Sequence, residues 1–157
     1  MASIRKFLDA VKELDLAPVL DGKSFGVLDR VGSIPNYKAG KSILDKFYCA
    51  LGIPIAEVSK DELEKYGDVA GVNIGGRAMV ADYLAPEDRA AVAAHEAGHR
   101  LSMDQRVAQL YAIKALDEAR KAASNEAERE FFEKALQSAL RSAQYFGIDL
   151  KAYRKSA

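Results

Sequence analysis

The chain has 157 residues, of which 49% are hydrophobic and 29% are charged, the proportions of an ordinary globular protein. This length is typical of one domain with its own core, and we expect a single domain over residues 1–157. The 23 Lys and Arg residues balance the 23 Asp and Glu residues, which argues against partners such as nucleic acid or an anionic membrane. The single cysteine, Cys49, excludes an internal disulfide, and no stretch resembles a membrane span or a signal peptide. These features predict a cytoplasmic protein.

The N-terminal part, residues 1–67, is predicted to be mainly helical. Apolar residues recur at helical spacing over residues 3–15. A second helix is predicted over residues 42–51, where the serine at the start is a suitable N-cap and Gly52 ends the helix. Cys49 belongs to the apolar pattern of this second helix, which favours a position in the core.

A β-hairpin is predicted over residues 68–84. Val69–Ile74 and Arg77–Leu84 have the composition of strands, and they flank Gly75-Gly76. Two glycines between two strands are typical of a two-residue hairpin turn, because both central residues of such a turn adopt a positive φ.

Helices are predicted from residue 86 to residue 146. Pro86 suits the first turn of a helix, and no later proline interrupts the chain. Breaks between helices are expected near residues 102–105 and 124–125, where polar and capping residues gather. The order of helices, a small hairpin and further helices predicts an α+β fold.

Five consecutive residues, His95-Glu96-Ala97-Gly98-His99, have the pattern of a catalytic metal site. The two histidines lie four residues apart, so on a helix their side chains share one face and are able to bind one ion. Imidazole nitrogens are common zinc ligands, and a catalytic zinc ion keeps a position open for water. Glu96 is placed to take a proton from that water as it attacks a carbonyl group. The sequence therefore predicts a Zn²⁺ site with His95 and His99 as ligands and Glu96 as general base.

This segment resembles the zincin metallopeptidases. His95 to His99 match their HExxH core, and Val92-Ala93-Ala94 supply the uncharged positions that precede it in their extended signature. Arg100 departs from that signature, which prefers an uncharged residue. The resemblance implies a zincin-like single domain, in which the hairpin packs on the motif helix, and an activity that hydrolyses peptide bonds.

A third ligand is implied by the same resemblance. The metzincin pattern requires Gly and His at the positions of Ser102 and Gln105, and the chain has no third histidine. The gluzincins match better, because a glutamate on a following helix completes their site, and Glu118 has a spacing that recurs among them. Small zincins of the ImmA/IrrE type also place a hairpin before the motif helix, but their glutamate comes later, at a position that Glu126 fits. The remaining alternatives are Glu128, Glu130 and Asp104.

The resemblance also suggests how a substrate would bind. Zincins bind the substrate backbone by strand addition to an edge strand, for which Arg77–Leu84 is the candidate, with plain packing as the other interpretation. Tyr111 is a candidate for stabilising an oxyanion, with core packing as the other interpretation. We therefore expect a zinc-dependent metalloendopeptidase that acts on a protein or peptide. The alternative is a catalytically degenerate zincin-fold protein that acts as a metal-dependent binding or regulatory module.

Overall fold

The computed structural model describes residues 42–148 of the chain. The elements in this range are α4 (Ile43–Leu51), β1 (Ile55–Val58), α5 (Lys60–Glu64), β2 (Gly71–Ile74), β3 (Arg77–Ala81), α6 (Pro86–Gly98), α7 (Gln105–Lys121) and α8 (Glu126–Tyr145). These five helices and one three-stranded sheet form a small α+β arrangement, as predicted. The helix predicted over residues 3–15 lies outside the described residues. None of the described helices is long and apolar enough to cross a membrane.

Local capping residues determine where several helices begin and end. The side-chain oxygens of Ser42, Ser59 and Asn125 each accept a hydrogen bond from the backbone N–H three residues later, at 3.1, 3.3 and 2.9 Å. Gly52 follows α4 with a φ of 75°, a left-handed conformation that glycine adopts without steric cost. The predicted bounds of α4 are therefore confirmed. The predicted breaks also occur, between α6 and α7 and between α7 and α8.

The sheet has the strand order β1-β3-β2, so β3 is its central strand. The predicted hairpin is confirmed, because β2 and β3 pair antiparallel and Gly75 and Gly76 have φ values of 59° and 80° in the turn. Strand β1 pairs parallel to β3 and was not predicted. Its four residues are half-buried or exposed and show no clear alternation, so its place depends on a partner that lies far along the chain.

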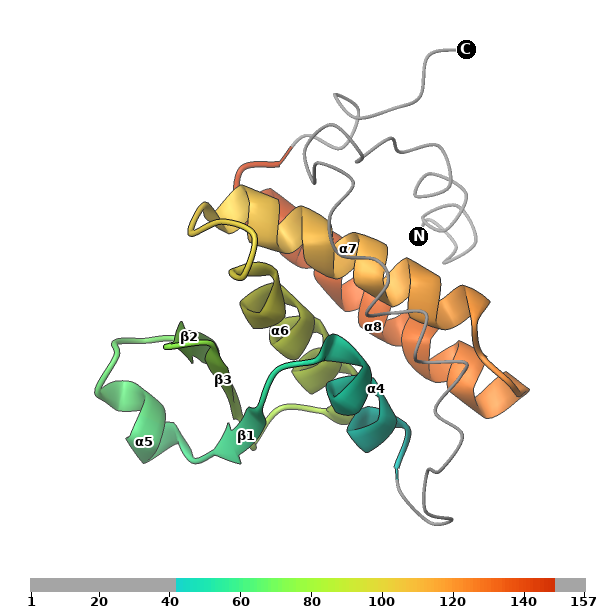
Figure 1. Ribbon diagram of the computed structural model, residues 1–157, viewed down its shortest axis with the longest axis horizontal. Coiled ribbons are helices and arrows are strands. Elements are labelled where there is room, and N and C mark those ends of the chain that lie inside the picture. Colours follow the sequence, from blue (N-terminus) through green and yellow to red (C-terminus); the bar gives the residue numbers. More distant parts are fainter. Residues whose placement is uncertain (1–41, 149–157) are drawn as a thin grey trace.

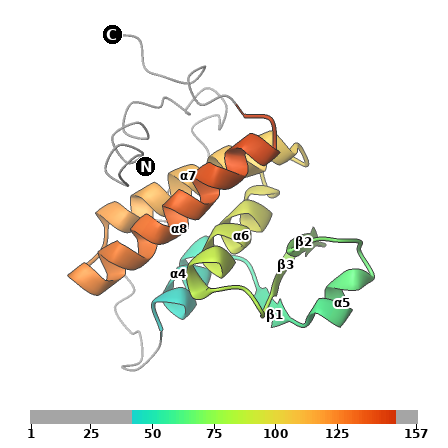
Figure 2. The same ribbon diagram turned by 180° about the vertical axis from the view of Figure 1, so that it is seen from behind.

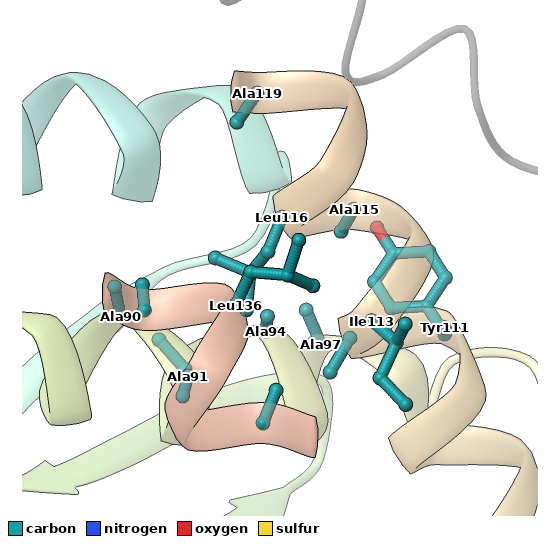
Figure 3. Close-up of a cluster of buried hydrophobic side chains, with 14 of the residues drawn as sticks. Ala90, Ala91, Ala94, Ala97, Tyr111, Ile113, Ala115, Leu116, Ala119 and Leu136 are labelled. Atoms are coloured by element: carbon teal, nitrogen blue, oxygen red, sulfur yellow. The ribbon is translucent and has the colours of Figure 1, made fainter. Parts of the chain in front are cut away.

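Helix α6 is at the centre of the fold. It contacts α4, α7, α8 and the strands β2 and β3, and Figures 1 and 2 show it between the sheet and the α7–α8 pair. Its buried residues from Ala90 onward are mostly alanines. Because alanine side chains are small, neighbouring elements come close on several sides, and larger residues such as Leu116 and Leu136 fill the space between them (Figure 3).

Two glycines allow the closest approaches to α6. A Cβ atom at Gly98 would lie 2.7 Å from the carbonyl oxygen of Ala108, so the start of α7 packs directly on the end of α6. A Cβ atom at Gly71 of β2 would lie 2.5 Å from Cγ1 of Val92 and 3.3 Å from Cγ of Glu96. Each of these two contacts therefore depends on the absence of a side chain.

The prediction of a core position for Cys49 was wrong. Phe47 of α4 is fully buried and its ring centroid lies 5.4 Å from that of Phe132 on α8. Cys49 follows Phe47 by two residues, about 200° around the helix, and its side chain is exposed. The apolar residues around Cys49 concealed this change of face.

Replacing Gly98 by alanine should destabilise the fold. Alanine normally favours a helix over glycine by about 1 kcal/mol, but here its methyl group would overlap the backbone of Ala108. We expect a loss of about 1–3 kcal/mol in the free energy of unfolding, measured by urea denaturation. The matched change Ala127→Gly, at an exposed position of α8, should cost no more than about 1 kcal/mol. A Gly98→Ala variant more stable than the natural chain would contradict the packing described.

Candidate metal centre

His95, Glu96 and His99 lie together at the C-terminal end of α6. A ligand atom of each lies within 4.8 Å of those of the other two, and His95 Nε2 is 3.9 Å from Glu96 Oε1. His99 follows the last residue of α6 but keeps a helical conformation, with a φ of −65°. The two imidazole centroids are therefore 5.0 Å apart, with the rings at 84°. The structure brings together the three residues that the sequence singles out.

Gln109 of α7 fixes the protonation of His95. The Nε2 amide of Gln109 donates a hydrogen bond to the backbone oxygen of Ala139 on α8, at 2.7 Å, so the Oε1 atom of Gln109 faces His95. Nδ1 of His95 lies 2.7 Å from this Oε1 and must carry a hydrogen to donate. Burial lowers the pKa of His95 and outweighs the two glutamine contacts, which raise it, and this favours the neutral ring with its proton on Nδ1. Its Nε2 atom consequently keeps a lone pair, as a metal ligand requires.

His99 is oriented in the same way by the loop after α6. Its Nδ1 lies 3.0 Å from the carbonyl oxygen of Ser102, which can only accept a hydrogen bond. Nδ1 therefore donates, and in the neutral ring the lone pair of His99 lies on Nε2. Metal-binding histidines in proteins are commonly oriented by such a carbonyl contact at the other ring nitrogen. Both histidines thus have the tautomer in which Nε2 binds a metal ion.

Glu96 is held between the sheet and the histidines. Its backbone oxygen accepts a hydrogen bond of 2.7 Å from Nδ2 of Asn73, which ties the end of α6 to β2. Residue Glu96 is only 7% exposed, and its Cγ atom lies close to Gly71. Burial raises the pKa of the Glu96 carboxyl to about 7, and the His99 imidazole, when it is protonated, lowers that pKa in part. The carboxyl group therefore binds and releases a proton near neutral pH.

The first residue of α7, Gln105, also contacts His95. Its Oε1 atom lies 2.6 Å from Nε2 of His95. From the sequence, Gln105 was noted only as the position where a metzincin has a histidine. Gln109 was not predicted as a site residue. The sequence holds one signal for Gln109, which is the polar residue within the apolar run Ala108 to Ile113. The structure shows that Gln109 is buried, at 2% exposed.

A cavity of about 670 Å³ opens beside these residues. His95 and Glu96 line it together with Gln105 and Gln109, the segment 68–71 before and at the start of β2, and residues of α6 and α8. The ring of Phe146 covers one face of His95, with the centroids 4.7 Å apart and the planes at 19°. The cluster is therefore buried on one side and open to a cavity on the other.

The glutamates considered as third ligands do not join this group in the part of the chain that the structure describes. Gln105 and Gln109 bring the start of α7 level with His95, so Glu118 lies about 13 Å beyond Gln109 along the helix. Its carboxylate is instead 3.2 Å from Nζ of Lys114. This arrangement does not support Glu118 as a ligand, because α7 begins soon after His99 and has passed the site well before residue 118.

The alternatives to Glu118 also lie elsewhere. Glu126, Glu128 and Glu130 belong to the first turns of α8, whereas the opposite end of that helix contacts His95 through Phe146. The carboxylate of Glu126 pairs with Arg129, and that of Glu128 pairs with Lys46. Asp104 caps α7 and accepts a hydrogen bond from the backbone N–H of Arg106. None of these carboxylates faces the histidines.

The structure corrects the expected edge strand and confirms the packing interpretation of Tyr111. Strand β3, which forms most of Arg77–Leu84, pairs with a strand on each side and has no free edge. Among the described strands, β2 is the edge strand that contacts α6. Tyr111 is fully buried, and its hydroxyl accepts a hydrogen bond of 3.1 Å from Arg100. Tyr111 is therefore a packing residue, and this contact also explains a charged residue at position 100.

No protein-family model, no curated protein sequence and no solved structure matches this chain.

Replacing Gln109 by leucine should destabilise the protein, because it leaves Nδ1 of His95 without a partner and removes the hydrogen bond that ties α7 to the Ala139 oxygen of α8. Each buried polar group left without a partner costs about 1–3 kcal/mol, measured as the free energy of unfolding in urea. Gln144→Leu is the matched control, since Gln144 is exposed on α8, and it should change stability by less than about 0.5 kcal/mol. Equal effects of the two changes would contradict the bridging role of Gln109.

Proposed function

We propose that this protein is a zinc-dependent metallopeptidase of the zincin type. The observation that carries the proposal is the matched orientation of the two histidines, each with Nδ1 directed at a carbonyl oxygen and Nε2 left as a ligand. Both rings adjoin the buried carboxylate of Glu96. Two neutral imidazoles and an adjacent carboxylate suit Zn²⁺, which prefers nitrogen donors of this kind.

Glu96 is the group that moves protons in this proposal. His95 and His99 would hold a zinc ion, which would polarise the carbonyl group of the substrate and lower the pKa of a bound water to about 7. The carboxylate of Glu96 lies 3.9 Å from Nε2 of His95 and is not one of the hydrogen-bond partners that orient the two histidines. It takes a proton from the attacking water and passes it to the nitrogen of the leaving amine. The hydrogen bond from Asn73 fixes the backbone of Glu96, and the absence of a side chain at Gly71 leaves room for the Glu96 side chain.

The cavity favours an extended peptide as the substrate. In an antiparallel pair, only every second residue of a strand directs its N–H and C=O groups at the partner strand. In β2 the N–H and C=O groups of Gly71 and Asn73 therefore point away from β3. A peptide segment is able to add to this edge beside α6. The described lining of the cavity includes Asp68 and Asp88 but no Lys or Arg, which favours neutral or cationic segments over acidic ones.

One observation favours a second candidate, a metal-dependent binding protein without turnover. No glutamate of α7 or α8 reaches the histidines in the described part of the chain, although the gluzincin pattern includes one. A site with fewer anionic ligands is able to bind a metal, and through it a carboxylate of a partner, without hydrolysing a peptide bond. Activity measurements separate this candidate from the first.

Metal analysis tests the site itself. Protein purified without added metal should contain about one zinc ion per chain, removable by a chelator. His95→Ala and His99→Ala should each abolish stoichiometric zinc at unchanged fold, judged by circular dichroism. A natural chain that remains metal-free after incubation with Zn²⁺ would exclude both candidate functions.

Replacing Glu96 by glutamine separates metal binding from catalysis. Glu96→Gln should keep the zinc but lower the rate of cleavage of dye-labelled casein by about 10²–10⁴-fold, because the amide does not accept the proton. Glu87→Gln is the matched control, since Glu87 lies on the same helix outside the cavity lining, and it should leave the rate unchanged. Full activity in Glu96→Gln would contradict the proposed base, and a zinc-loaded natural chain without any cleavage would favour the binding protein.

A further inference from the structure

The contact between His95 and Gln105 has an unusual chemical character. Nε2 of His95 carries a lone pair, because Gln109 and Ala139 assign the proton of the ring to Nδ1. The atom of Gln105 that faces it, at 2.6 Å, is the amide oxygen, which is also an acceptor. Two acceptors repel each other at this distance, so the contact is favourable in three cases: a cation lies beside both atoms, the amide is turned so that its nitrogen donates, or Nε2 itself carries a proton.

The placement of Gln105 fits the role of a ligand. As the first residue of α7 it is exposed, so its side chain is able to rotate around the ligand atom of His95. Amide oxygens of Asn and Gln are accepted metal ligands, although less common on zinc than carboxylates. Among the described oxygen donors of α7 and α8, Gln105 alone contacts a ligand nitrogen of the cluster.

We propose that the amide oxygen of Gln105 is the third protein donor to the metal ion, in the place of the glutamate that gluzincins use. This inference rests on the metal site proposed above. A neutral third ligand leaves more positive charge on the ion than a glutamate does. The site therefore binds zinc less tightly than a site with two histidines and one carboxylate, and it attracts an anionic group to the ion more strongly.

Zinc affinity of the full chain tests this role, measured by competition with a chromophoric chelator. Gln105→Glu should bind Zn²⁺ at least about 10-fold more tightly, because it adds a negative charge at the donor position. Gln105→Ala should bind it at least about 10-fold more weakly, since one donor is lost. The Co²⁺-substituted protein supplies a second readout, because its d–d absorption depends on the donor set and should change in both variants.

Gln144 provides the matched controls. Gln144→Glu and Gln144→Ala make the same chemical changes at an exposed position of α8, and they should leave both the affinity and the Co²⁺ spectrum unchanged. Gln105 is itself exposed, so its replacement should not affect the core, and equal thermal unfolding of all four variants would verify this.

Three results would overturn the proposal. Unchanged affinity and spectrum in both Gln105 variants would show that Gln105 is not a ligand. Tighter zinc binding by Gln105→Ala would show that the amide instead donates to Nε2 and competes with the metal. In both of these cases zinc binding by the natural chain, and its loss in His95→Ala, would leave the proposed function intact. A natural chain that binds no zinc would remove the function and this inference together.

Discussion

A buried imidazole needs a partner at both of its nitrogens, and this requirement organises the centre of the protein. Helix α6 is enclosed by α4, α7, α8 and the sheet, so the side of His95 that faces α7 and α8 lies away from water. Gln109 meets the need at one nitrogen of His95 by bridging to the backbone of α8. The other nitrogen is directed at the cavity. The packing therefore dictates which atom of His95 is available to a ligand.

The same packing determines what surrounds the available atoms. Gly98 allows α7 to start against the end of α6, which brings Gln105 and Gln109 level with His95. Gly71 allows β2 to approach from the other side, so the carboxylate of Glu96 is confined beside the histidines. A pair of neutral nitrogen donors, a confined carboxylate and an adjoining cavity is the combination on which a metallopeptidase depends.

Features encoded over a few residues could be predicted from the sequence. The caps of α4 and α8, the two-glycine turn and the spacing of the two histidines each depend on contacts within four residues of one another. The grouping of His95, Glu96 and His99 followed from the geometry of one helix, and the structure confirms that grouping.

Features that depend on the offset between separate elements could not be predicted in this way. The loop from His99 to Asp104 is short, and its length decides that position 105 rather than position 118 meets the site. Strand β1 is recognisable only through its pairing with β3, and that pairing makes β3 a central strand. Gln105 was seen as a mismatch to a known pattern, because nothing local to it indicates which side chain it contacts.

The imidazole ring of His95 contacts residues from three helices, because Phe146 stacks on it at the end of α8. Helix α6 carries His95, α7 contributes Gln105 and Gln109, and α8 contributes Phe146 together with the Ala139 oxygen. Any opening of the α7–α8 pair must disturb the ring, and any ligand that holds the ring must resist that opening. At the proposed metal site, metal binding and helix docking would thus be thermodynamically linked. The slowest amide hydrogen exchange in α7 and α8 would then report on occupancy of the site as much as on the strength of the core.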